Sequence, residues 1–217
     1  MVYLRRAVYP APVRRGAERA TLLKRGVGLR KFLARAFLAA TGWKPEGERP
    51  RDRRFVLIAA PHTSNWDLAY LLALSELFDV RVSWMGKDAL FRPPLGWLMR
   101  RLGGIPVVRH KRGNLVAQAA QRFAAAQELA LVVPAEGTRG AVEYWKSGFY
   151  HIARSADVPI VLGYLDYARR RGGFGPSLRA TENVTKDMDQ IREFYADKRG
   201  KYPEQFVEPR LKEEPEA

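Results

Sequence analysis

Cysteine is absent from this 217-residue sequence. The absence excludes disulfide scaffolds, cysteine-ligated zinc sites, iron–sulfur clusters and thiolate nucleophiles, and it is typical of a reducing compartment. Any catalysis by this chain must therefore use oxygen or nitrogen groups.

Long apolar segments are also missing. The longest stretch without a charged residue, Phe55–Trp66, has 12 residues, whereas a helix needs about 20 to cross a bilayer. No uninterrupted apolar region precedes Lys24 and Arg25, so the N-terminus lacks the pattern of a secretory signal. We therefore expect a cytoplasmic chain without a transmembrane helix.

Sequence patterns for several bound groups are absent as well. The chain has neither G-x-x-x-x-G-K-[ST] nor G-x-G-x-x-G, which disfavours ATP and dinucleotide chemistry. His110 and His151 belong to no H-E-x-x-H or comparable spacing, so the sequence predicts no metal site.

Acidic residues are few near the N-terminus. The whole chain has 38 Lys and Arg against 23 Asp and Glu, a net charge of +15. Residues 1–54 hold 15 basic and 4 acidic side chains, so +11 of that charge precedes residue 55. Such a segment favours an anionic partner, either nucleic acid phosphates or acidic lipid headgroups.

The basic segment contains one predicted helix. Between residues 17 and 40, apolar side chains recur at three- and four-residue intervals with basic residues between them; they are Leu22, Leu23, Val27, Leu29, Phe32, Leu33, Ala36 and Phe37. The pattern is typical of an amphipathic helix in the interface of an acidic membrane. Two other interpretations stay open: an arm that binds nucleic acid, and a helix that packs on the domain as ordinary core.

Composition divides the chain into three parts. Residues 1–45 form the basic arm and amphipathic helix, residues 46–202 form a domain, and residues 203–217 form an acidic tail with three prolines. We expect the tail to be frayed. The sequence leaves the oligomeric state open.

In the domain, apolar strand-like runs alternate with helical patterns. The strands are expected near residues 55–60, 80–85, 105–109, 129–134, 159–165 and 177–184, and the helices near 66–78, 95–102, 115–128, 146–155 and 186–198. Such alternation predicts an α/β class, a layered domain with a mostly parallel central sheet flanked by helices.

A histidine and a carboxylate follow the first of these strands. His62 comes directly after the run that ends at Ala60, and Asp67 lies five residues later. If Thr63 or Ser64 caps a helix that begins near Trp66, a carboxylate in its first turn can reach back to the imidazole. A neutral histidine held by a carboxylate is a general base that can deprotonate a hydroxyl. The alternative is an unrelated loop histidine and helix-start acid.

Basic side chains follow other strands of the sheet. Lys87 and Arg109 end two strands, and Glu136, Gly137, Thr138 and Arg139 follow a third. The carboxyl ends of parallel strands share one edge of a sheet, where open α/β folds bind ligands. The glycines allow a tight turn, Arg139 could bind a phosphate, and Glu136 could hold Arg139 or a substrate hydroxyl. Ordinary surface ion pairs are the alternative.

Four ordered blocks then resemble a known family. The H-x-x-x-x-D of His62 and Asp67, the segment Gly104–Arg109, the E-G-T-R of Glu136–Arg139 and the apolar Val158–Ile160 are similar to the blocks of the 1-acylglycerol-3-phosphate acyltransferases, the glycerolipid acyltransferase family. The resemblance covers roughly residues 55–165. Pro61 and Ala135 stand where the family usually has asparagine and proline.

The resemblance implies a reaction and a role for each residue. It implies direct transfer of a fatty acyl group from acyl-CoA or acyl carrier protein to a lysophospholipid hydroxyl, without metal or cofactor. His62 would be the base and Asp67 would orient it, while Arg109 and the Glu136–Arg139 turn would hold the phosphate of the acceptor and Pro159 would help to shape the site. Lys87, at the end of a neighbouring strand, is a further predicted substrate-binding residue. An acyl-serine route through Ser64, another lipid or glycolipid acceptor, and a nucleic-acid-binding protein without catalysis are the alternatives. For the enzyme we expect a peripheral location on the inner face of the plasma membrane.

Overall fold

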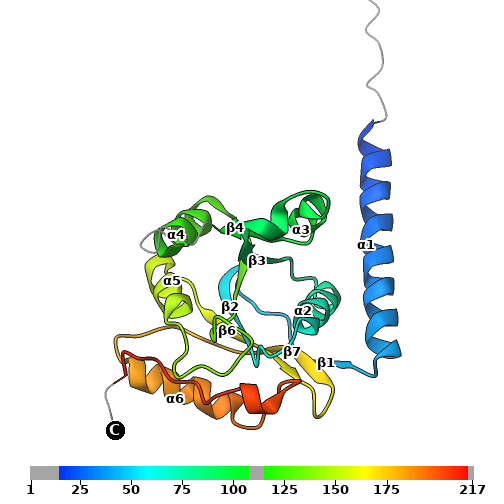
Figure 1. Ribbon diagram of the computed structural model, residues 1–217. Helices are drawn as coiled ribbons and strands as arrows, with labels where there is room; N and C mark the ends of the chain where they lie inside the picture. Colours follow the sequence, from blue (N-terminus) through cyan, green and yellow to red (C-terminus); the bar gives the residue numbers. More distant parts are fainter. Residues whose placement is uncertain (1–14, 108–114, 215–217) are drawn as a thin grey trace, which may run out of the picture.

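Seven strands form one sheet within the residues that the computed structural model describes, 15–107 and 115–214 (Figure 1). Their order is β1-β7-β6-β2-β5-β3-β4, with bounds Lys44–Gly47 (β1), Arg54–Ala60 (β2), Val82–Lys87 (β3), Gly104–Val107 (β4), Leu129–Val133 (β5), Ile160–Asp166 (β6) and Arg171–Leu178 (β7). The five strands from β6 to β4 are parallel, whereas β7 is antiparallel to β6 and β1 is parallel to β7. The predicted α/β class with a mostly parallel sheet is confirmed.

Strand β2 occupies the middle of the sheet, between β5 and β6. Its side chains alternate between two cores: Val56 and Ile58 pack on one face, and Phe55 and Leu57 pack on the other. A strand buried on both faces needs a continuous apolar run, which the sequence supplies here. The buried strand holds the loop that follows Ala60 in a fixed place at the carboxyl edge of the sheet.

Helices cover both faces of the sheet (Figure 1). The described helices are Arg15–Ala40 (α1), Trp66–Leu77 (α2), Gly96–Arg101 (α3), Leu115–Ala125 (α4), Gly148–Ala156 (α5) and Val184–Tyr195 (α6), with 3₁₀ turns at Asp88–Phe91 (η1) and Pro203–Gln205 (η3). Side chains of α4, α5 and α6 pack in the core that contains Ile58, and side chains of α2 and η1 pack in the core that contains Leu57.

Helix α1 runs along α2 and extends beyond the body of the domain (Figure 1). Ala34 and Leu38 are buried in a core shared with α2, and Lys31 forms an ion pair with Asp79 at 2.6 Å. The outer face is different, because large apolar side chains lie exposed there: Leu29, Phe32 and Leu33. The C-terminal part of the helix therefore packs on the domain. Within the described residues, no helix combines the length and apolar character needed to cross a membrane.

The strand expected at residues 177–184 is wrong in position. The observed β7 is Arg171–Leu178, and it also pairs with β1, which was not predicted. Glycine-rich β7 has low intrinsic strand propensity, but close packing requires the glycines. A Cβ on Gly173 would lie 1.9 Å from the Glu46 carbonyl oxygen, and one on Gly175 would lie 2.3 Å from the Phe194 ring.

The expected frayed tail is also corrected for residues 203–214. Leu211 is buried and forms an isolated β-bridge with Trp145. The Glu214 carboxylate accepts hydrogen bonds from Arg192 at 2.7 Å and from the Leu211 backbone N–H at 2.6 Å. One buried leucine and one paired buried carboxylate hold the segment on α6. The described residues do not include residues 1–14, which are most of the arm before the helix, or residues 215–217.

Candidate active site

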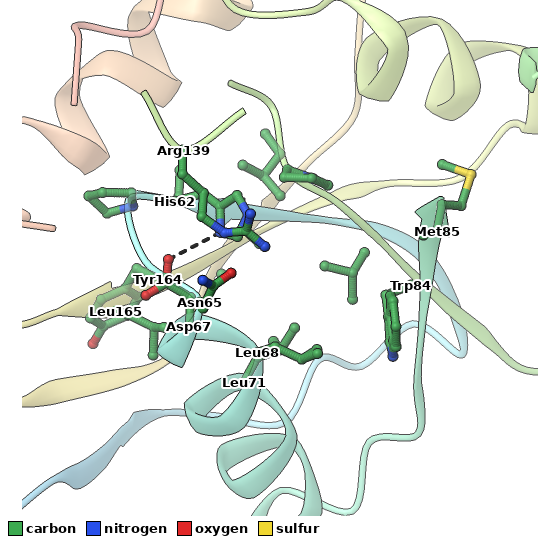
Figure 2. Close-up of a pocket in the computed structure, with 18 of the residues that line it drawn as sticks. His62, Asn65, Asp67, Leu68, Leu71, Trp84, Met85, Arg139, Tyr164 and Leu165 are labelled. Carbon is green, nitrogen blue, oxygen red and sulfur yellow. Dashed lines mark hydrogen bonds and ion pairs between the residues drawn. The ribbon is translucent and has the colours of Figure 1, made fainter. Parts of the chain in front are cut away.

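The loop between β2 and α2 brings His62 and Asp67 together (Figure 2). His62 Nδ1 lies 3.1 Å from Asp67 Oδ2, and Asp67 is in the first turn of α2. The helix cap differs from the expectation, because Asn65 is at the N-cap and makes no side-chain capping bond. Ser64 contributes instead through its Oγ, which accepts from the Trp66 backbone N–H at 3.2 Å.

Asp67 receives hydrogen bonds on both carboxylate oxygens. Oδ2 accepts from the Ser64 backbone N–H at 2.9 Å as well as from His62, and Oδ1 accepts from the Tyr167 hydroxyl at 2.6 Å. Only 5% of the residue is exposed. With the carboxylate held in this way, His62 donates its Nδ1 proton to Asp67, and Nε2 is the ring nitrogen left to accept a proton.

Glu136 lies behind this loop rather than in the cavity. The residue is fully buried, and its Oε1 accepts from the His62 backbone N–H at 2.8 Å. Its Oε2 has no hydrogen-bond partner among the described residues. Burial raises the pKa of Glu136, the hydrogen bond from the His62 backbone opposes that rise, and the nearby Asp67 charge adds to it, so that the pKa is about 7.

The expected role of Glu136 as a holder of Arg139 or of a substrate hydroxyl does not match this position. No hydrogen bond or ion pair links Glu136 to Arg139 in the described residues. Its contact is with the backbone of His62, so the carboxyl fixes the loop that carries the histidine. Burial of this kind depends on how β5 and β2 pair, which the E-G-T-R pattern does not encode.

A cavity of about 650 Å³ opens beside His62. Its polar end contains His62, Asn65, Asp67 and Arg139, several of whose side chains are labelled in Figure 2. Its other end is apolar and lies between α2 and β3, with walls formed by Leu68, Leu71, Trp84, Met85, Met99 and Phe174. The cavity therefore joins one polar end, which contains Arg139, to one apolar end.

The structure gathers most of the predicted site residues on this cavity. Its lining includes the predicted catalytic pair and four predicted binding residues, namely Lys87, Gly137, Thr138 and Arg139. Lys87 ends β3, as expected from the parallel sheet. Arg109 lies outside the described residues.

Pro159 is not part of the site. Its carbonyl accepts from the Val56 backbone N–H at 2.9 Å, at the start of β6. Because β6 is parallel to β2, that start lies at the edge of the sheet opposite to His62. The proline therefore cannot shape the cavity directly.

Tyr167 and Asn65 are site residues that the sequence analysis missed. Asn65 lies between His62 and Asp67 in the sequence, and this position could have identified it as a residue of the site. Tyr167 is 100 residues from its partner Asp67 in the chain. It follows β6, the strand beside β2, and only that strand pairing brings it to the catalytic edge.

Comparisons with known proteins add to this geometry. The sequence model of a family described as Acyltransferase matches residues 44–162. A search of curated proteins found no match to this chain. Among solved structures, the chain is similar to the 1-acyl-sn-glycerophosphate (LPA) acyltransferase PlsC from Thermotoga maritima, with a TM-score of 0.58 and 18% identity over 83% of this chain and 80% of that one. At this identity the likeness shows a shared fold.

Proposed function

This chain belongs to the acyltransferase family, and from that premise we propose that it transfers a fatty acyl group from a thioester, acyl-CoA or acyl carrier protein, to a hydroxyl of a lysophospholipid such as 1-acylglycerol-3-phosphate. One observation carries the proposal. The His62–Asp67 pair lies at the polar end of a cavity whose other end is apolar. A lysophospholipid and a fatty acyl thioester are substrates that need both environments.

The proposed reaction uses His62 as a general base. Nε2 takes the proton of the acceptor hydroxyl as its oxygen attacks the thioester carbonyl, and the bond to sulfur then breaks. The thiolate leaves with the proton from the imidazolium, so the base is restored and the products are an ester and a thiol. A thioester is already activated, so the reaction needs neither a metal nor a cofactor.

The position of Ser64 favours direct transfer over a route through an acyl-serine intermediate. It is buried and is not among the residues that line the cavity. Its Oγ already accepts a hydrogen bond from the Trp66 backbone, and no hydrogen bond joins it to His62 in the described residues. A serine nucleophile needs an adjacent base and an open path to the carbonyl.

The two ends of the cavity fit the two substrates. Among the described residues, Arg139 and Lys87 are the cationic side chains that line it, and an arginine fork or a lysine ammonium can bind the acceptor phosphate. The apolar walls from Leu68 to Trp84 fit an alkyl chain, since burial of each methylene contributes about 0.8 kcal/mol. We therefore assign the phosphate to the Arg139 end and the acyl chain to the space between α2 and β3.

A substitution series tests the base. His62→Ala and Asp67→Ala should each lower the rate of CoA release from acyl-CoA and 1-acylglycerol-3-phosphate by about 100-fold or more. His151→Ala, which removes an exposed histidine of α5, should leave the rate unchanged. Mass spectrometry of the product identifies the acceptor from a panel of lysophospholipids and glycolipids. Equal CoA release by all four proteins would show that this pair is not the base.

We also propose that an acidic membrane surface is the partner of α1 and that the enzyme is peripheral on the cytoplasmic face of the plasma membrane. The exposed Leu29, Phe32 and Leu33 alternate in the sequence with the exposed Arg30 and Arg35, and a helix with both kinds of side chain is typical of a membrane interface. A nucleic-acid arm needs few large aliphatic side chains. In flotation assays, the protein should rise with anionic vesicles, and at the same salt concentration it should bind little duplex DNA. Binding to DNA without binding to vesicles would show that nucleic acid is the partner of this segment.

A further inference from the structure

Asp67 has one hydrogen-bond donor that comes from a distant part of the chain. The Tyr167 hydroxyl donates to Oδ1 at 2.6 Å, whereas the other two donors, His62 and Ser64, both bind Oδ2 and belong to the same loop as Asp67. Tyr167 is therefore the contact that fixes the second oxygen of the carboxylate. Without it, only the donors to Oδ2 would restrain rotation of the Asp67 carboxylate about its Cβ–Cγ bond.

The Tyr167 ring is held in an aromatic cluster. It packs edge-on against Trp43, at 4.9 Å between ring centroids, and against Tyr70 of α2 at 5.8 Å. Trp43 in turn stacks on Tyr70 at 4.3 Å, and Phe37 of α1 lies 5.2 Å from the same tyrosine. Such contacts fix the direction in which the phenol points.

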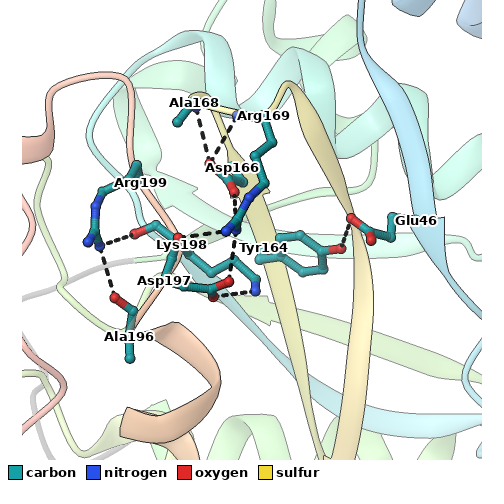
Figure 3. Close-up of polar contacts among 9 residues, drawn as sticks. All are labelled: Glu46, Tyr164, Asp166, Ala168, Arg169, Ala196, Asp197, Lys198 and Arg199. Atoms are coloured by element: carbon teal, nitrogen blue, oxygen red, sulfur yellow. Dashed lines mark hydrogen bonds and ion pairs between the residues drawn. The ribbon is translucent and has the colours of Figure 1, made fainter.

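A polar network holds the backbone on both sides of Tyr167 (Figure 3). The buried Asp166 accepts from the Ala168 backbone N–H at 3.1 Å and from the Arg169 guanidinium at 3.0 Å. Arg169 also donates to the Asp197 carboxylate at 2.8 Å, which ties the turn after β6 to the end of α6. The Tyr167 backbone N–H donates to the Arg199 carbonyl at 2.9 Å. The aromatic contacts therefore fix the Tyr167 ring and the polar contacts fix its backbone, independently of the hydrogen bond from its hydroxyl to Asp67.

We propose that Tyr167 is a positioning residue for the proposed reaction: its hydroxyl locks the Asp67 carboxylate in the orientation that holds His62 in the Nδ1–H tautomer. The proposal rests on the function proposed above. Tyr167 acts through Asp67 and His62 and is not among the residues that line the cavity.

The phenol remains a donor throughout the pH range in which an enzyme of this kind works. Burial raises the pKa of Tyr167, and the hydrogen bond to Asp67 and the charge of that carboxylate raise it further. A permanent donor on Oδ1 reduces the negative charge that Asp67 presents to the imidazole. The tyrosine therefore affects the charge of the carboxylate that faces His62 as well as its direction.

Tyr167→Phe tests the proposal, because it removes the hydroxyl and keeps the ring. The value of kcat should fall about tenfold, with little change in KM. The acidic limb of the pH profile of kcat/KM should move to higher pH, because a carboxylate that has lost a donor attracts the protonated imidazole more strongly. Nitrogen-15 NMR of His62 should show one tautomer in the wild type and a mixture in the variant.

Tyr150→Phe is the matched control. Its buried hydroxyl also donates to an aspartate, Asp187, at 2.8 Å, but from α5 on the other face of the sheet. This variant should lose stability without a change in kcat, in the pH profile or in the His62 NMR signals. The control separates loss of a buried hydrogen bond from loss of the bond to Asp67.

The outcomes separate this inference from the proposed function. If His62→Ala abolishes activity while Tyr167→Phe keeps the wild-type kcat, pH profile and tautomer, the tyrosine is structural only and the inference is wrong. If His62→Ala keeps activity, the proposed function itself fails. If Tyr167→Phe does not fold well enough for kinetics, the effect of Trp43→Phe decides: it loosens the ring and leaves the hydroxyl, so an unchanged pH profile and tautomer in that variant would also overturn the inference.

Discussion

Two carboxyl groups flank His62 and have different roles because their surroundings differ. Asp67 accepts three hydrogen bonds on its two oxygens. Glu136 accepts one, on one oxygen, and is fully buried. A carboxylate with few donors is costly to desolvate, and its pKa rises accordingly. Asp67 is suited to stabilise an imidazolium, whereas Glu136 is suited to hold a backbone N–H at low or neutral pH.

This difference predicts a pH-dependent effect of Glu136 on stability. Its pKa rises from 4.5 in the unfolded chain to about 7 in the folded protein, so its contribution is fully present below 4.5 and is lost as pH rises through about 7. Glu136→Gln keeps an acceptor for His62 and does not titrate. Between pH 4.5 and 7, the free energy of unfolding of the variant should therefore rise relative to that of the wild type, by roughly 3 kcal/mol at most. Chemical denaturation measures this difference.

Glu213→Gln is the contrasting control for that measurement. A hydrogen bond from Ser147 lowers the pKa of Glu213, so its contribution is present above 4.5 and is lost as pH falls. The difference in free energy of unfolding between this variant and the wild type should stay constant from pH 5 to 8. If the difference for Glu136→Gln is also constant over this range, Glu136 does not take up a proton on folding.

At the scale of the element, α1 has two apolar faces with different environments. Leu38 is 2% exposed against α2, while Leu33, on the outer side of the same helix, is 57% exposed. A basic residue stands three positions before each leucine, Arg30 before Leu33 and Arg35 before Leu38, so this local spacing does not distinguish their environments. What differs is the partner: α2 covers one face, and the domain leaves the other face open.

A matched pair of leucine substitutions tests the two faces. Leu38→Ala should lower the free energy of unfolding by about 2–4 kcal/mol because it leaves a cavity in the core. Leu33→Ala removes the same atoms and should change stability by less than about 0.5 kcal/mol, but it should weaken binding to anionic vesicles. Denaturation and flotation measure the two effects. Loss of stability in Leu33→Ala with unchanged flotation would place that face in a protein contact.

At the scale of the whole molecule, the charge is concentrated in two places. Most of the net +15 precedes residue 55, in the segment that contains α1, while Lys87 and Arg139 line the cavity. An anionic bilayer would therefore attract the N-terminal segment, and the acceptor phosphate would be attracted to the site. One kind of ligand chemistry, the lipid phosphate, accounts for both.

Salt should separate the electrostatic part of membrane binding from the apolar part. Raising the salt concentration from about 0.1 M to about 1 M shortens the screening length from about 10 Å to about 3 Å. The fraction of protein bound to anionic vesicles should fall strongly, and the weaker binding to neutral vesicles should change little. Flotation across a salt series measures this, and binding to anionic vesicles that does not respond to salt would contradict a role for the basic segment.

The sequence by itself determined the features that depend on neighbouring residues. The apolar run before His62 predicted β2, strand and helix alternation predicted the α/β class, and the five-residue spacing predicted the contact with Asp67. These follow from local period and from groups a few residues apart. The order of the four blocks indicated the family.

Only the tertiary structure decided what depends on distant surfaces. Strand pairing buried Glu136 behind His62, brought Tyr167 to Asp67 across 100 residues and put Pro159 at the opposite edge of the sheet. It also made a strand of the glycines in β7 and buried Leu211. Desolvation and long-range hydrogen bonds arise only when separate segments meet, and no local pattern encodes which segments those are.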